Sequence, residues 1–394
     1  MSGEADLGAW GVYVHVPFCP RRCTYCDFAV VVGKRPSDEL AYVDALVREW
    51  QSRILPQGEP HAVYLGGGTP SKLSAPMVER ILGAICQRTG GLGTEVTLEV
   101  NPETVDQERL QAFRQAGITR LSIGAQALQD HHLRAMHRGH RSQDIGRTVD
   151  WAKSAGFASI SLDAIYGWPG QRFDEWQATI QGLIRLEPDH LSLYQLQIEP
   201  HTALYRKVRS GEMLPVESDL VADMSDWAGD ELSRFGYDRY EISSYAHPGH
   251  EGRMNRLYWT MNPYVGIGMA AHSFDGTRRW WNVPHFGEYI ERTALRQDPR
   301  ADGEALQRLD LMREYSWLGL RTVEGFSRDR FQRRFGEDAL TVFRPVWEQL
   351  QRQGLVQWDA ERIRLSARGL DLANQVMAAL IDAEAHKSPE TDHV

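Results

Sequence analysis

Three cysteines stand close together near the N-terminus, in the stretch Phe18-Cys-Pro-Arg-Arg-Cys-Thr-Tyr-Cys-Asp-Phe28. Cys19, Cys23 and Cys26 follow the spacing Cys-x3-Cys-x2-Cys, so the fold has to bring three sulfur atoms round one centre. Thiolates select iron–sulfur clusters, zinc or copper. Three thiolates can hold a four-iron cluster and leave one iron open for a small molecule, which the iron can supply with an electron. The spacing therefore favours redox chemistry.

Two other interpretations of these cysteines remain open. Structural zinc takes four ligands, and His15 stands close enough along the chain to be the fourth. A disulfide is less favoured, because the acidic N-terminal residues 1–6 lack the apolar segment of a signal peptide. Reduced thiols in the cytoplasm are therefore expected. The remaining cysteine, Cys86, falls in a predicted helix over 78–88 and is expected to be a small packing residue.

Size and charge narrow the class of protein. A chain of 394 residues is long enough for two domains with a substantial core. No run of eighteen apolar residues occurs, so no membrane span is expected. The formal net charge of −9 argues against nucleic acid as a partner, since nucleic-acid binding needs a basic surface.

The first 240 residues alternate between short β-rich runs and amphipathic helices. This alternation predicts parallel strands joined by right-handed crossovers, in an open sheet or a partial barrel. The expected strands cover 12–16, 62–65, 96–100, 120–124, 159–165 and 191–198. The expected helices between them include 38–53, 107–116, 142–155 and 173–186.

Glycine-rich and polar segments follow the same end of each predicted strand. Ligands of parallel sheets gather at the carboxyl ends of the strands, so these segments predict one active-site face. Besides the cysteine segment they are Gly66–Pro70, Glu99–Pro102, Gly124–Gln126, Asp163–Gly170 and Tyr194–Pro200.

The pattern changes after residue 242. Residues 243–300 are rich in aromatic side chains and glycine and are expected to form an irregular connecting segment. Residues 301–385 predict helices and a hairpin over 354–365, as in a winged-helix-like module. Because acidic and basic residues nearly balance along this module, a docking or lid role is favoured over DNA binding. The polar residues 386–394 are expected to be a disordered tail.

Several motifs together resemble a known family. The cysteine motif, Gly66-Gly-Gly-Thr-Pro70, Glu99-Val-Asn-Pro-Glu103 and Leu121-Ser-Ile-Gly-Ala-Gln126 resemble the radical S-adenosylmethionine (SAM) superfamily. Tyr240–Ala246 and Gly266–Phe274 are similar to its HemW heme-chaperone branch in particular. The resemblance runs from Tyr13 to Ala378. It implies an α/β fold in which residues 1–242 form a partial (β/α)6 TIM-type barrel, residues 243–300 a heme region, and residues 301–385 the C-terminal accessory domain.

The resemblance also implies cofactors and their ligands. Cys19, Cys23 and Cys26 would hold a [4Fe-4S] cluster, and SAM would bind the open iron. An electron donor of the flavodoxin or ferredoxin type would reduce the cluster. The residues that match SAM contacts of the superfamily are Tyr13, Gly67, Gly68, Thr69, Glu99, Gln126, Arg138 and Asp163.

Within the superfamily, a heme chaperone that passes heme to an acceptor protein competes with two kinds of enzyme. Oxygen-independent coproporphyrinogen III oxidases carry a further cysteine where this chain has Phe28, and they have a longer segment before the motif. Both differences favour the chaperone. Radical SAM methyltransferases need a second cofactor site, which no motif of this chain indicates.

One motif departs from the chaperone branch. Where the branch has His-Asn-x-x-Tyr-Trp, linked to heme binding, this chain reads Met254-Asn-Arg-Leu-Tyr-Trp259. A thioether can ligate heme iron, so Met254 is a candidate heme ligand. His272 is a second candidate, and His247 and His250 are also within reach along the chain. Packing in a core is the alternative role for Met254.

Overall fold

The computed structural model describes residues 8–384. Its centre is a run of six neighbouring parallel strands that occur in chain order within a larger sheet. They are β1 (Gly11–Val16), β4 (Ala62–Gly67), β5 (Glu95–Val100), β6 (Arg120–Gln126), β7 (Ser159–Tyr166) and β8 (His190–Gln195). All six coincide with predicted strands, although the last ends three residues before its predicted end. The predicted α/β class with a partial (β/α)6 barrel is thereby confirmed.

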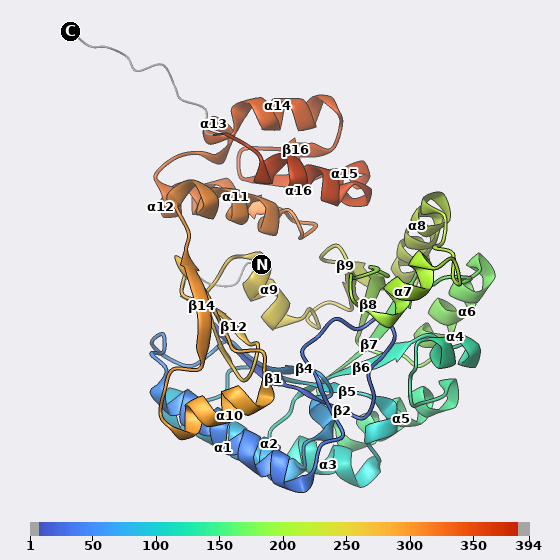
Figure 1. Ribbon diagram of the computed structural model, residues 1–394. Coiled ribbons are helices and arrows are strands. Elements are labelled where there is room, and N and C mark those ends of the chain that lie inside the picture. Colours follow the sequence, from blue (N-terminus) through green and yellow to red (C-terminus); the bar gives the residue numbers. More distant parts are fainter. Residues whose placement is uncertain (1–7, 385–394) are drawn as a thin grey trace.

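Helices cover the outer face of these strands (Figure 1). In α2, the apolar residues Val78, Ile81, Leu82 and Ile85 recur at helical spacing and are buried, and Gly90 ends the helix in the left-handed conformation that glycine favours. The helices of this layer and the short helical segments near the strand ends are α1 (Pro36–Ser52), η1 (Pro70–Lys72), α2 (Ala75–Thr89), η2 (Pro102–Thr104), α3 (Gln107–Gln115), α4 (Asp130–Ala135), α5 (Ser142–Ala155), α6 (Phe173–Ile184), α7 (Ala203–Arg209) and α8 (Ser218–Arg234).

The prediction of irregular structure over 243–300 is wrong. This segment extends both edges of the sheet: β11 pairs in parallel with β1, and β12, β13 and β14 add antiparallel strands beyond it, whereas β10 pairs with β8 and with β9. The strands are short, and β1, the parallel partner of β11, is remote in sequence, so local patterns carry little sign of them. The elements are β9 (Asp238–Arg239), β10 (Ser244–Ala246), α9 (Arg253–Trp259), β11 (Tyr264–Ile267), β12 (His272–Phe274), β13 (Arg278–Asn282), α10 (Phe286–Ala294) and β14 (Arg300–Ala305).

A buried carboxylate on α1 fastens this extension to the barrel. Glu49 is 1% exposed and accepts hydrogen bonds from Arg53 on its own helix. It also accepts from the Gly268 backbone at 2.8 Å, from Asn282 Nδ2 at 2.7 Å and from the Tyr289 hydroxyl at 2.5 Å. One side chain thus satisfies donors from the β11–β12 loop, β13 and α10, which holds β11 against β1.

The C-terminal module has a hydrophobic core of its own. Its three-stranded sheet, in the order β15-β17-β16, is antiparallel and contains the predicted hairpin. The module contacts the sheet extension through Arg334, which donates to the carbonyls of Met261 and Gly276, both at 3.0 Å. Its elements are α11 (Arg308–Gly319), β15 (Phe326–Ser327), α12 (Arg328–Phe335), α13 (Ala339–Val342), α14 (Arg344–Arg352), β16 (Val356–Trp358), β17 (Arg362–Leu365), α15 (Ala367–Asp371) and α16 (Ala373–Ile381).

Two expectations concern the rest of the chain. Among residues 8–384, no helix combines the length and apolar character that crossing a bilayer requires. The tail predicted over 386–394 lies outside the described residues.

Removing the Glu49 carboxylate should loosen the sheet extension. We expect Glu49→Ala to lower the free energy of unfolding by about 3–5 kcal/mol, because it breaks the buried ion pair with Arg53 and leaves the Gly268 N–H and the Tyr289 hydroxyl without an acceptor. Arg53 then keeps only Asn282 Oδ1 and Asp298 as acceptors. Urea unfolding followed by tryptophan fluorescence measures the change. Glu79→Ala, at an exposed position of α2, is the matched control and should stay within about 0.5 kcal/mol of wild type. Equal losses from both variants would show that Glu49 has no special role.

Candidate functional site

The three clustered cysteines line one cavity at the carboxyl ends of the central strands. The cavity has a volume of about 440 Å³. The segment that carries the cysteines follows β1 through β2 (Phe18–Cys19) and returns at β3 (Val31–Val32). The Thr24 backbone N–H of this segment donates to the Met136 carbonyl at 3.1 Å, and its carbonyl accepts from the Leu204 backbone at 2.8 Å. Elements after β6 and β8 therefore hold the cysteine segment over the cavity.

Seven of the eight residues expected to contact SAM line this same cavity. They come from the ends of four neighbouring strands and from the loop after α4, as the predicted active-site face requires. These residues are Gly67, Gly68, Thr69, Glu99, Gln126, Arg138 and Asp163.

The glycine turn after β4 packs against the start of the cysteine segment. A Cβ atom at Gly68 would lie 2.6 Å from the Pro17 carbonyl oxygen, so no larger residue fits there. Gly67 has a φ of 112°, which glycine alone adopts readily. This close approach brings the Thr69 hydroxyl to 3.3 Å from Cys19 Sγ, within hydrogen-bond reach of the sulfur.

The half-buried Arg138 side chain lies beside the cysteines. Arg138 donates to Asn101 Oδ1 at 2.6 Å and to the Gly124 carbonyl at 3.0 Å, and its Nη1 lies 3.7 Å from Cys23 Sγ. Its Nε atom is buried without a hydrogen-bond partner among the described residues. A buried donor without a partner is rare in folded proteins. Its position on the wall of the cavity fits a bound polar group.

The chemistry of the thiols fits a metal centre. Burial raises the pKa of Cys19 to about 11, and burial also raises the pKa of Cys26. Thiolates therefore form in this cavity when a cation compensates their charge, as iron does in a cluster. Cys86 lies apart on α2, half-buried, and no disulfide joins any of the described cysteines.

His15 does not join the three cysteines. Its Nδ1 atom lies 3.2 Å from the Tyr13 hydroxyl and its Nε2 atom 3.1 Å from the Ala29 carbonyl. It lines a second cavity rather than the one that holds the sulfur atoms. The zinc interpretation, with His15 as fourth ligand, therefore has no geometric support.

Two carboxylates form another wall of the cysteine cavity. Burial, reinforced by the nearby Asp163, raises the pKa of Glu99 to about 7. Glu99 accepts from the Tyr64 hydroxyl at 2.9 Å and from the Gly67 backbone at 3.1 Å. Burial likewise raises the pKa of Asp163, which accepts from the Ser122 hydroxyl at 2.7 Å. These side chains offer acceptors for a ligand that carries ammonium or hydroxyl groups.

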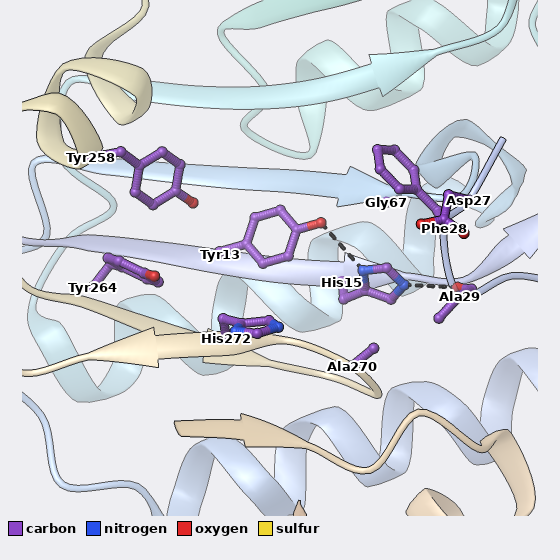
Figure 2. A pocket seen from close by; sticks show the side chains of 10 residues that line it. All are labelled: Tyr13, His15, Asp27, Phe28, Ala29, Gly67, Tyr258, Tyr264, Ala270 and His272. Carbon is purple, nitrogen blue, oxygen red and sulfur yellow. Dashed lines mark hydrogen bonds between the residues drawn. The ribbon is translucent and has the colours of Figure 1, made fainter. Parts of the chain in front are cut away.

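The second cavity, of about 400 Å³, adjoins the first, and Gly67, Asp27 and Phe28 line both. Its other walls are aromatic and imidazole side chains from β1, α9, β11 and β12 (Figure 2). They include Tyr13, His15, Tyr258, Tyr264 and His272. Tyr13, the eighth residue expected to contact SAM, therefore lies in this cavity and not with the other seven.

The two candidate heme ligands, His272 and Met254, differ in exposure and in surroundings. His272 is exposed at the second cavity, where it stacks on Trp281 with ring centroids 5.6 Å apart. Met254 is 1% exposed and packs with Ala62 and Leu257. A Cβ atom added at Gly11 would lie 2.6 Å from the Met254 sulfur, so this sulfur packs directly against the backbone of β1. The expectation that Met254 ligates heme is corrected: its thioether is a packing group and reaches neither cavity.

Several residues of the cavity walls were not predicted from the sequence, among them Asn101, Tyr64 and Tyr258. Asn101 stands inside the segment Glu99–Pro102, whose role was assigned to Glu99 alone. Tyr64 is the register partner of Tyr13 on β4, so aligning the first two predicted strands would have placed both rings on one face. Tyr258 belongs to the Met254–Trp259 motif, in which Met254 alone was predicted to contact a ligand.

Comparisons with known proteins agree with this architecture. Residues 13–183 match the family model described as the radical SAM superfamily, and residues 306–372 match that of the HemN C-terminal domain. The heme chaperone HemW of Bacillus subtilis strain 168 is 31% identical over 94% of this chain and 98% of its own length. The heme chaperone HemW of Mycobacterium tuberculosis H37Rv is 34% identical, over 94% and 95% respectively.

Among solved structures, the coproporphyrinogen III oxidase HemN from Escherichia coli superposes with a TM-score of 0.82. The superposition covers 95% of this chain and 90% of HemN, at 22% identity. At that identity the likeness shows the fold alone.

The cavity predicts which cysteines assemble a cluster. After anaerobic reconstitution with iron and sulfide, we expect about four iron atoms per wild-type chain. Cys19→Ala should lose them, because one of the three thiolates around the centre is gone. Cys86→Ala is the matched control and should keep them. Iron and labile-sulfide analysis measures the cluster content of each protein. Equal loss of iron from Cys19→Ala and Cys86→Ala, or zinc without labile sulfide in the wild type, would contradict the assignment.

Proposed function

Since the chain belongs to the HemW heme-chaperone family of the radical SAM superfamily, we propose that it binds heme and transfers it to an acceptor protein. The single observation that carries the proposal is the pair of adjoining cavities with a common wall of Gly67, Asp27 and Phe28. One cavity has the donors for a cluster and SAM. The other has the aromatic and imidazole surface that suits a tetrapyrrole.

In the first cavity, we assign Cys19, Cys23 and Cys26 as ligands of the [4Fe-4S] cluster that membership of the superfamily implies. When bound, the reduced cluster supplies an electron to the sulfonium group of SAM. The chain's own contribution is orientation and charge. The Arg138 guanidinium balances thiolate charge, the Gly67–Thr69 turn lets a ligand approach the backbone, and Glu99 and Asp163 accept hydrogen bonds from it.

In the second cavity, we assign His272 as an axial ligand of heme iron. Partial desolvation of the imidazole at the cavity wall and the nearby Arg279 guanidinium lower the pKa of His272, which favours the neutral imidazole that binds iron. Stacking on Trp281 orients the ring. The rings of Tyr13, Tyr258 and Tyr264 offer flat apolar surface to the macrocycle. Both ring nitrogens of His15 are already engaged, so His272 is the imidazole available.

The proposal also includes an acceptor protein, an electron donor and a cellular compartment. The acceptor is a protein that takes heme from the second cavity. The electron donor is of the flavodoxin or ferredoxin type. We place the transfer in the cytoplasm, where the free thiols of this chain stay reduced. Porphyrinogen oxidation is not proposed as a second function, because Phe28 stands where the oxidases have a further cysteine.

A heme titration tests the role of the second cavity. We expect His272→Ala to weaken heme binding by about tenfold or more and to shift the Soret band, because an axial ligand is lost. Met254→Leu should leave both unchanged, since leucine fills a buried methionine site at similar volume. His285→Ala, an exposed histidine at the start of α10, is the matched control. Wild-type behaviour of His272→Ala, or loss in Met254→Leu, would overturn the ligand assignment.

The raised pKa of Glu99 predicts that SAM binding depends on pH. Its pKa is raised to about 7, so the side chain is mostly neutral near pH 6 and mostly ionised near pH 8. Because SAM is a cation, we expect affinity for the cluster-loaded protein to rise by up to about tenfold across this interval.

Glu99→Gln removes the ionisable group and isolates this effect. The variant should bind SAM weakly at both pH values and lose most of the pH dependence. Isothermal titration calorimetry under anaerobic conditions measures both proteins. An unchanged pH profile in Glu99→Gln would assign the dependence to another group.

A further inference from the structure

A second group of potential metal ligands lies where α4 and α6 meet, away from the cysteines. His131 and His132 stand near the start of α4, and Glu175 stands in the first turn of α6. His131 Nε2 lies 3.2 Å from Glu175 Oε1, and His132 Nε2 lies 3.2 Å from Glu175 Oε2. One nitrogen from each imidazole and one oxygen of the carboxylate all lie within 4.8 Å of one another.

The geometry points to a binding site for one divalent transition-metal ion of the zinc type. A tetrahedral ion with nitrogen and oxygen ligands about 2.1 Å away holds those ligand atoms about 3.4 Å apart. The two 3.2 Å separations run to different oxygens of the Glu175 carboxylate. One ligand atom from each of the three residues lies within 4.8 Å of the others, so rotation of the exposed His131 ring would bring the set to that spacing. Two imidazoles and a carboxylate are a donor set that suits zinc and leaves a fourth position for water.

Two of the ligands are held in place before any ion binds. The side chains of His132 and Glu175 are 4% and 9% exposed, whereas that of His131 is 57% exposed. The Arg172 backbone N–H donates to the carboxylate oxygen Oε2 of Glu175 at 3.0 Å, and the Gln129 side chain donates to the backbone carbonyl of Glu175 at 2.8 Å. Outer contacts of this kind orient metal ligands. The exposed His131 side gives the ion a path from solvent.

The charged groups nearby do not block the site. Arg172 Nη1 lies 3.5 Å from Glu175 Oε1. The Arg172 side chain is 66% exposed, however, and it also forms an ion pair with Asp174 at 2.9 Å. It can therefore turn outward when an ion arrives.

The position of the site gives it a structural consequence. Immediately after these histidines, the carbonyls of Ala135 and Met136 accept hydrogen bonds from the hydroxyl and backbone N–H of Thr24, between two of the clustered cysteines. An ion that joins α4 to α6 therefore stabilises the helix that supports the cysteine segment. The ion would stiffen this support without touching either cavity.

Zinc binding to the cluster-loaded protein tests the inference, because the three clustered cysteines are then occupied. We expect one zinc ion per chain after equilibrium dialysis, measured by elemental analysis. His131→Gln, at the most exposed ligand, should weaken binding by more than about a hundredfold, since even loss of an outer-shell contact costs about 10–100-fold. His285→Gln is the matched control and should bind as wild type does. Zinc should also raise the melting temperature of wild type and control but not of His131→Gln.

Two outcomes would overturn the inference. The first is wild-type protein that retains no zinc under these conditions. The second is zinc retention that is equal in wild type, His131→Gln and Glu175→Gln. Either result would leave His131, His132 and Glu175 as a hydrogen-bonded contact between two helices.

Discussion

Strand β1 is the element on which the rest of the molecule depends. It pairs in parallel with β4 on one side and with β11 on the other, so it belongs both to the barrel and to its extension. Its residues Tyr13 and His15 line the second cavity, and its end leads into the cysteine segment. The cavities adjoin because β1 lines the second cavity and leads directly into the segment that lines the first. The Glu49 carboxylate preserves this arrangement by fastening the loop after β11 to α1.

Electrostatics explains why the two cavities differ. The lining of the cysteine cavity combines three thiols with more carboxylates than guanidinium groups, an arrangement that favours cationic occupants such as iron and a sulfonium compound. The second cavity shares Asp27 and Phe28 with the first, but its other polar and aromatic walls are tyrosine rings and imidazoles, which favour a flat apolar ligand with a metal at its centre. Phe28, on the shared wall, is the apolar residue that stands between these environments.

Much of the fold and of the candidate site could be predicted from patterns among residues that are close together in the sequence. The six central strands and their helices could be predicted because period-2 and period-3.6 patterns are written into consecutive residues. The cysteine motif and the glycine turn at Gly66–Pro70 were recognisable for the same reason. Met254 shows where such reasoning ends: its place in a motif suggested a ligand, whereas packing against Gly11 and Leu257 makes it part of a core.

The sequence by itself determined the cysteine triad, the strand–helix alternation and the side of the sheet on which polar segments gather, because each depends on residues near one another in the chain. Only the tertiary structure decided that β11 joins β1, that Tyr13 faces the second cavity, and that His131 and His132 meet Glu175. Those contacts join segments far apart in sequence, and their partners are selected by the packing of the whole fold rather than by any local preference.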